Sequence, residues 1–193
     1  VFRITDNEIE EAVTQFGKKH SLSDNTNFLA HCKAAKAVLS FRSFVKDYQL
    51  DIIALEEMAT CRSIQTSTPI DIFALGEYKG EKLIVFANFK TSESSGTFHK
   101  WQCAIEYMCA TESLDLKEYI AQGYKPMVCT VRPKDWRLKS GATYEVVDYT
   151  EFAQSEFATE TISSVSKILI AAGQYKKPSM AYPSLDSSVE GGY

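Results

Sequence analysis

The sequence predicts an α/β protein with a central mixed β-sheet flanked by helices on both faces. Two observations lead to this prediction. Apolar runs of strand length alternate with helical segments along the 193 residues, an order typical of layered α/β folds. The runs at 71–78 and 82–89 are apolar at most positions, which predicts strands that are covered on both faces.

The first half of the chain contributes two helices and the first strands. The predicted helices are 5–17 and 28–47, joined by the polar loop SLSDNTN at 21–27. LDIIALEEM at 50–58 predicts a strand. The apolar runs 71–78 and 82–89 flank the turn YKGEK and predict a β-hairpin.

The second half continues the alternation. Helices are predicted within 97–123, where Gly123 is a helix stop, and strands at 125–133 and 143–149. A basic loop, RPKDWRLKSGA, joins these strands, and one long helix covers 150–172. We expect a single domain over 1–175 and a flexible tail over 176–193, which is rich in Ser, Pro and Gly.

Composition narrows the class of protein. Apolar residues make up 45% and charged residues 24% of the chain, as in an ordinary soluble globular protein. The charged start has no signal-peptide pattern, and no apolar stretch predicts a membrane span. Five cysteines without a CxxC pair indicate a reducing compartment such as the cytoplasm. A net charge of −4 argues against a protein that coats nucleic acid through a basic face.

Three polar residues in the predicted hairpin point to chemistry. Asn88 and Lys90 are two positions apart on one strand, so their side chains leave the same face. The hairpin brings Asp71 of the paired strand close to them. A buried carboxylate is costly without a partner. Carboxylates beside a lysine are suited to a divalent cation that activates water at a phosphate.

The segments PID at 69–71 and ANFKTS at 87–92 resemble the PD-(D/E)XK nuclease superfamily, in particular its RecB-like and phage-exonuclease branch. In that branch the metal-binding segment reads as an apolar run followed by D-x-K-T-S. The helix segment HKWQCAIEY at 99–107 resembles the glutamine-to-tyrosine helix that follows the lysine. The resemblance covers roughly residues 28–110.

The resemblance implies a set of site residues and a cofactor. The expected ligands of Mg²⁺ or Mn²⁺ are His31, Asp71, Asn88 and one of Glu56 and Glu57, with Glu56 slightly favoured. Lys90 is expected to act on the attacking water or on the phosphate. Gln102 and Tyr107 are expected to position the substrate or Lys90.

Two departures from the family pattern leave alternatives open. Asn88 stands where the family has Asp or Glu, and the step from Gln102 to Tyr107 is five residues rather than four. Three explanations of Asn88 stay open. It is an engineered Asp-to-Asn substitution that traps substrate, a natural loss of catalysis, or a sign that the resemblance is accidental. His31 could be an ordinary buried histidine. Gln102 and Glu106, one helical turn apart, could form only a polar face.

The basic loop offers a second candidate surface. Arg132, Lys134 and Arg137 surround Trp136, and such a group can grip a phosphate backbone and stack on a base. A solvated loop is the equal alternative. The sequence therefore predicts a metal-dependent DNA nuclease, with exonuclease work in recombination, repair or replication implied by the resemblance. The alternative is a catalytically inactive module of the same fold that binds nucleic acid or a protein partner.

Overall fold

The computed structural model describes residues 11, 14, 15, 18, 19, 23–91, 96–134 and 143–173. The predicted tail at 176–193 and most of the predicted helix at 5–17 lie outside these residues. In chain order the helices and strands are α2 (Asp24–Asp47), β1 (Asp51–Cys61), β2 (Thr66–Tyr78), β3 (Glu81–Phe89), α3 (Thr97–Ser113), α4 (Lys117–Ala121), β4 (Lys125–Lys134), β5 (Thr143–Asp148), α5 (Thr150–Ala153) and α6 (Glu156–Ala171).

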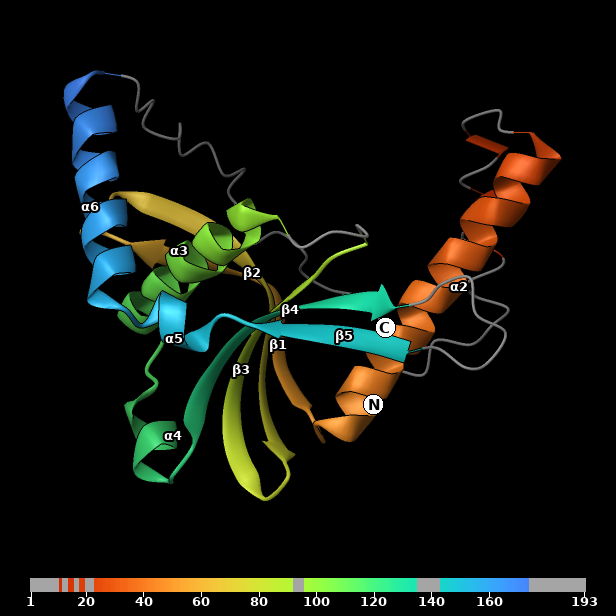
Figure 1. The fold of residues 1–193 in the computed structure, drawn as a ribbon, viewed down its shortest axis with the longest axis horizontal. Coiled ribbons are helices and arrows are strands. Elements are labelled where there is room, and N and C mark those ends of the chain that lie inside the picture. Colours follow the sequence, from red (N-terminus) through yellow and green to blue (C-terminus); the bar gives the residue numbers. More distant parts are fainter. Residues whose placement is uncertain are drawn as a thin grey trace, which may run out of the picture.

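The described strands form one mixed sheet in the order β1-β2-β3-β4-β5. Neighbouring strands are antiparallel except β3 and β4, which are parallel and are joined through α3 and α4. In Figure 1 the sheet occupies the centre, with α2 at one end of the molecule and α6 at the other. This arrangement confirms the predicted α/β class with a central mixed sheet.

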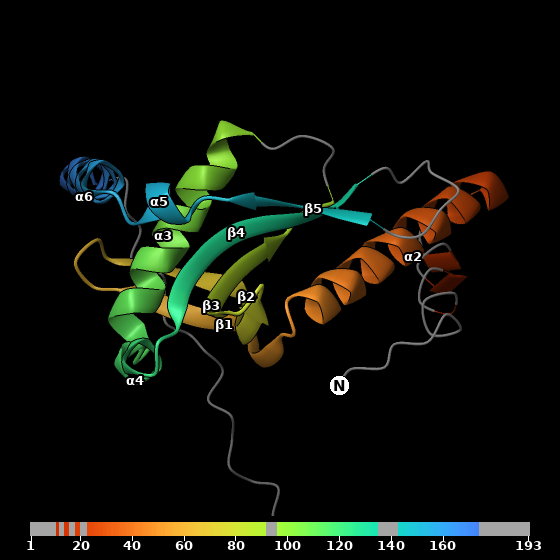
Figure 2. The same cartoon turned by 60° about the horizontal axis from the view of Figure 1, so that its bottom comes forward.

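Each face of the sheet has its own apolar core. On β3, Leu83, Val85 and Ala87 belong to the core that also contains Phe44 of α2. The alternating residues Ile84 and Phe86 belong to the core beneath α3. Figure 2 shows α2 and α3 against the two sides of the sheet. The continuous apolar run of β3 is therefore explained by burial on both faces.

β1 and β2 form a hairpin that the sequence did not predict, and both strands are longer than expected. β1 and β2 pair as far as Cys61 and Thr66, so β2 begins before the predicted start at Asp71. The sequence CRSIQTSTP hid this extension, because its residues are mostly polar. β1 is an edge strand of the described sheet and has several exposed side chains, so polar residues are tolerated there.

Two helix boundaries also differ from the prediction. α2 begins at Asp24, inside the predicted loop, because the side chain of Ser23 accepts a hydrogen bond from the backbone N–H of Thr26 at 3.2 Å. The predicted helix 150–172 is divided into α5 and α6. Ser155 has extended backbone angles and accepts a bond from the N–H of Ala158 at 3.2 Å, so it caps a new helix.

Among the described residues, no helix combines the length and apolar character that a membrane crossing requires.

Candidate functional site

The candidate site lies where β2 and β3 separate. Their ladder runs to the pair Ile72–Ala87, and Asp71 and Asn88 come next on the two strands. At this point a side-chain oxygen replaces a backbone carbonyl as acceptor, because the N–H of Phe89 donates to Oδ2 of Asp71 at 3.2 Å. The N–H of Lys90 donates instead to the carbonyl of Val131 on β4 at 2.8 Å. The separation leaves room for polar side chains in an otherwise apolar sheet.

Asn88 is the centre of a buried polar cluster. Its alternation with Ile84 and Phe86 turns it toward α3. Its Nδ2 donates to Oε2 of Glu106. Its Oδ1 accepts from Nζ of Lys90 at 3.0 Å and from Nε2 of Gln102 at 3.2 Å.

The helix α3 supplies the other half of this cluster. Gln102 and Glu106 are four residues apart and therefore share one helix face. Nε2 of Gln102 also donates to Oε1 of Glu106, at 2.8 Å. Asn88 is 2% exposed and Glu106 is 3% exposed. We call Asn88, Lys90, Gln102 and Glu106 the polar cluster; Asp71 borders it.

Burial controls the charge of Glu106. Desolvation raises its pKa above the ordinary value, and the carboxylate of Asp71 raises it further. Hydrogen bonds from Asn88 and Gln102 and the charge of Lys90 act in the opposite direction. Burial likewise raises the pKa of the neighbouring thiol of Cys103 to about 12. This thiol therefore stays protonated at neutral pH and is unsuited to act as a nucleophile.

Tyr107 does not join the polar cluster. Its hydroxyl accepts a hydrogen bond from Nε2 of Gln154 at 3.2 Å, and its ring lies edge-on to Phe86. With Gln154 and Glu112 it lines a cavity of about 460 Å³ between α3 and α5. One step along a helix turns a side chain by about a quarter of a circle or slightly more, so Tyr107 and Glu106 diverge.

Glu56 and Glu57 are both exposed on β1. Glu57 pairs with Ile70 and Leu55 pairs with Ile72, so Glu56 lies opposite Asp71 in the register. Its backbone is left-handed, with φ of 55°, which is uncommon for a residue other than glycine. Within the described residues, no three His, Cys, Asp or Glu side chains are placed to hold one metal ion. Because Asn88 is an amide and the side chain of His31 lies outside the described part of the structure, the expected four-residue ligand set stays a prediction.

Other predicted residues lie away from the cluster or outside the description. His31 belongs to α2, but its side chain lies outside the described part of the structure. Arg132 bonds to Glu145 of β5 through Nε at 2.7 Å, so it already has an anionic partner. Lys134 is exposed at the end of β4. Trp136 and Arg137 lie outside the described residues.

Glu106 is the site residue that the sequence did not single out. It was predicted only as a possible member of a polar helix face. A weak signal was present, since the small residues Cys103 and Ala110 are three and four positions away and form a buried stripe with it. A glutamate within such a stripe indicates a buried carboxylate.

Comparison with known proteins adds no family. No protein-family model matches the chain, and the curated proteins contain no significant match.

Proposed function

We propose that the chain is a metal-dependent DNA nuclease in which Glu106 supplies the carboxylate that is missing at position 88. One observation carries this proposal. Two carboxylates, Asp71 and Glu106, border the Asn88–Lys90 pair at the separation of two strands. Among the described residues, each oxygen of Glu106 and one oxygen of Asp71 accept a single hydrogen bond, and a carboxylate oxygen can accept two. Within that part of the chain, both carboxylates therefore keep acceptor positions for a ligand.

The donor chemistry fits a hard divalent cation through two carboxylates rather than through Asn88. The two donors to Oδ1 of Asn88 already use its lone pairs. Asp71 raises the pKa of Glu106, so the two negative charges oppose each other, and a cation between them would relieve that repulsion. Asp71 and Glu106 are thus the residues to hold Mg²⁺ or Mn²⁺. When bound, such an ion activates water and stabilises negative charge at phosphorus.

The remaining side chains have roles that follow from their contacts. Lys90 is half-buried, and its Nζ is held by Asn88, so its ammonium group has a fixed direction. A fixed ammonium can donate to a phosphate oxygen and stabilise charge there. Gln102 donates to both Asn88 and Glu106. We therefore assign Gln102 a positioning role.

The test combines metal binding with cleavage. We expect Mn²⁺ to bind in a calorimetric titration and labelled DNA, duplex or single-stranded, to be cut when Mn²⁺ is present. Asp71→Asn and Glu106→Gln should remove both properties, with cleavage falling roughly a hundredfold or more. Lys90→Met should keep metal binding and lose cleavage. Glu112→Gln, a change on the same helix but outside the polar cluster, is the matched control. Absence of Mn²⁺ binding would contradict the proposal.

A second function is favoured by the hydrogen bonds that already link the polar cluster. Asn88 bonds to Glu106, Lys90 and Gln102 without any ion, which is the arrangement expected of a nuclease fold that only binds nucleic acid or a protein. Asn88→Asp separates the two functions. Metal-dependent cleavage in the Asp form alone would mean that this chain is an inactive relative of an enzyme. Cleavage in neither form, together with retained DNA binding, would favour the binding module.

A further inference from the structure

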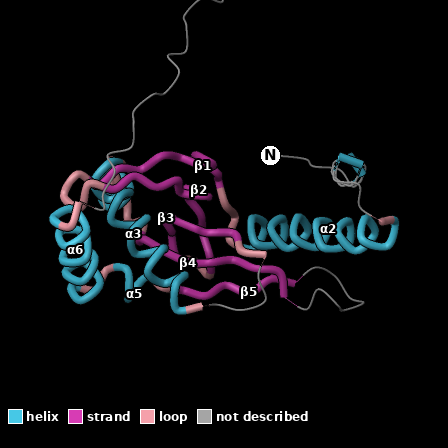
Figure 3. The backbone as a smooth tube through the Cα atoms, turned by 90° about the horizontal axis from the view of Figure 1, so that it is seen from above, coloured by secondary structure: helices cyan, strands magenta, loops and turns pink. Residues whose placement is uncertain are grey.

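Within the described part of the chain, the helix α6 has an apolar stripe that no other element covers. Ala158 and Ile162 of its first half are buried in the core beneath α3. Phe157, Val165, Ile168 and Leu169 are exposed, Phe157 by 64% and Ile168 by 67%. In Figure 3 α6 lies at the edge of the molecule, with α3 and α5 on one side only. A stripe of large apolar side chains on a surface helix marks an interaction surface.

The spacing of the stripe fits a partner helix. Phe157, Thr161, Val165 and Ile168 follow one another at steps of four, four and three residues. These steps keep the side chains on one line along the helix, as in the contact seam of paired helices. We call these four residues the α6 seam.

Charges beside the seam specify the partner and its direction. Glu160 and Lys167 are seven residues apart, so they lie on the same flank, two turns from each other. If two copies of α6 pack antiparallel about a two-fold axis near Ser163, Glu160 of one copy lies beside Lys167 of the other, and the reverse contact follows by symmetry. The same axis sets Phe157 against Ile168 and Thr161 against Val165, so the two larger side chains meet and the two β-branched side chains of similar size meet.

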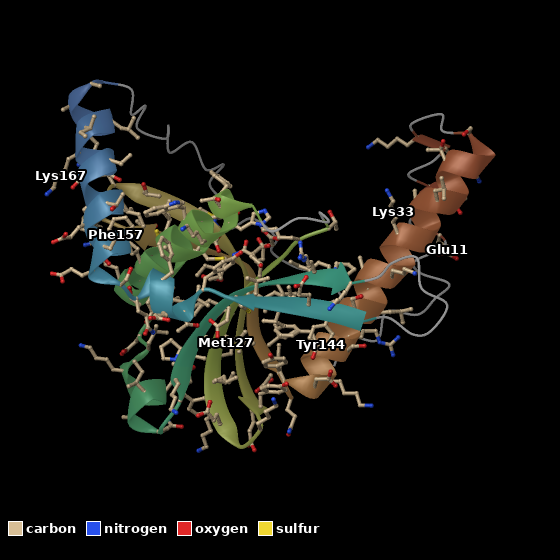
Figure 4. All side chains as sticks on the ribbon, in the orientation of Figure 1. Glu11, Lys33, Met127, Tyr144, Phe157 and Lys167 are labelled. Carbon is tan, nitrogen blue, oxygen red and sulfur yellow. The ribbon has the colours of Figure 1, made fainter. Side chains whose placement is uncertain are left out.

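We propose that two copies of this chain associate through the α6 seam with the two helices antiparallel. The helix carries both signs needed for self-complementarity, which a contact with an unrelated partner does not require. Phe157 and Lys167, near the two ends of α6, can be followed in Figure 4. The edge strand β1 is a poorer surface for self-association. Glu56 and Glu57 are exposed near its middle, and like charges on an edge strand oppose edge-to-edge pairing.

The main test is the mass of the full chain by sedimentation equilibrium over a wide range of concentration. We expect a monomer–dimer equilibrium. Ile168→Glu should abolish the dimer, because it places two charges in the apolar seam. Ile120→Glu makes the same change on α4, where the side chain is 52% exposed, and should leave the equilibrium unchanged. A monomer at every concentration would overturn the proposal, as would a dimer that Ile168→Glu does not affect.

A charge exchange tests the antiparallel direction. Glu160→Lys or Lys167→Glu alone sets like charges against each other at two symmetric places, and we expect each to weaken the dimer by about tenfold. The double variant with both changes restores opposite charges and should recover most of the affinity. Failure of the double variant to recover, with Ile168→Glu still monomeric, would overturn the antiparallel arrangement. Circular dichroism of each variant confirms that the fold is retained.

Discussion

Two glutamates on α3 experience opposite environments. Glu106 is buried against the sheet, and desolvation raises its pKa. Glu112, less than two turns further along, is exposed and its pKa is lowered, chiefly by a hydrogen bond from the thiol of Cys61 and by one from the backbone N–H of Arg62. Both carboxylates accept hydrogen bonds from side chains. The difference therefore comes from water, since Glu112 keeps its hydration and Glu106 has lost it.

The contrast separates a structural role from a candidate chemical role. Glu112 fastens the end of α3 to the turn after β1, where it accepts from Arg62 at 2.7 Å and from Cys61 at 3.0 Å. Its charge is stabilised by these bonds and needs nothing more. The charge of Glu106 is destabilised by burial and by Asp71, although Lys90 and two amides offset part of the cost. A cation would improve the environment of Glu106 but would add little to that of Glu112.

Asn88→Asp should have the largest effect on this contrast. The change sets a second carboxylate against Glu106, to which the Asn88 amide now donates. An uncompensated charge in a buried cluster costs about 3 kcal/mol, so we expect the free energy of unfolding in EDTA at pH 8 to fall by roughly that amount. At pH 5 the two carboxyl groups can share a proton, and the loss should shrink. Urea unfolding of the parent and of the variant at both pH values measures this loss of stability.

Mn²⁺ and a surface variant are the controls for this change. Saturating Mn²⁺ should restore much of the stability of the Asp form, because a ligand that binds only the folded state stabilises it. Gln122→Glu makes an amide-to-carboxylate change at an exposed position after α4 and should alter stability by less than about 0.5 kcal/mol. If Asn88→Asp is no more costly than Gln122→Glu, Asn88 and Glu106 do not form a desolvated pair.

Glu106→Ala should have the next largest effect. It leaves Nδ2 of Asn88 with only the weak acceptor Sγ of Cys103, at 3.8 Å, and opens space in the core, which together cost about 2 kcal/mol. Removal of the destabilised charge offsets part of this cost. Glu112→Ala removes bonds at an exposed position and should lower stability by clearly less. Thermal and urea unfolding of both variants compare the middle and the C-terminal end of α3, and an equal loss would contradict the assigned environments.

The sequence predicted the mixed sheet and the order of helices and strands along the chain better than the ends of the strands. The runs that form β3 and the second half of β2 are buried on both faces, so their apolar composition identifies them. The pairing of β1 with the start of β2 lies at an edge and includes the small polar residues Thr60, Ser67 and Thr68, so this segment lacks the apolar composition of a buried strand. Likewise Ser155 interrupts the last helix through a single capping bond, a local event within a continuous helical pattern.

The sequence predicted those parts of the candidate site whose positions depend on backbone geometry alone. The alternation of strand residues places Asn88 and Lys90 on one face, and the helix that follows brings Gln102 to them. Glu106 was missed because its spacing of one helical turn from Gln102 is the same whether the two side chains face the core or the solvent. Only the packing of α3 on the sheet decides whether this helix face is buried or solvated. Tyr107 was misplaced in the expected group because the helix rotation directs it toward Gln154.

The smallest effects concern pH, and here the two glutamates should differ in sign. For Glu106 the folded pKa is raised above the ordinary value of 4.5. The folded state then holds its proton longer than the unfolded state, so stability is lost as pH rises above 4.5 and through the folded pKa. Glu106→Gln should remove this loss. The difference in unfolding free energy between the variant and the parent should therefore shift in favour of the variant as pH increases above 4.5.

For Glu112 the pKa in the folded state lies below the ordinary value of 4.5. Its contribution to the free energy of unfolding is therefore present above pH 4.5 and is lost as the pH falls through the folded pKa. Glu112→Gln should be less stable than the parent at pH 7, and the difference should shrink only below 4.5. The two pH windows thus lie on opposite sides of the same ordinary value. Urea unfolding of the parent and both variants between pH 3 and pH 8 measures them, with circular dichroism to monitor the fold. If both variants change over the same pH range, desolvation does not distinguish the two carboxylates, and the case for Glu106 as a cation ligand loses its electrostatic basis.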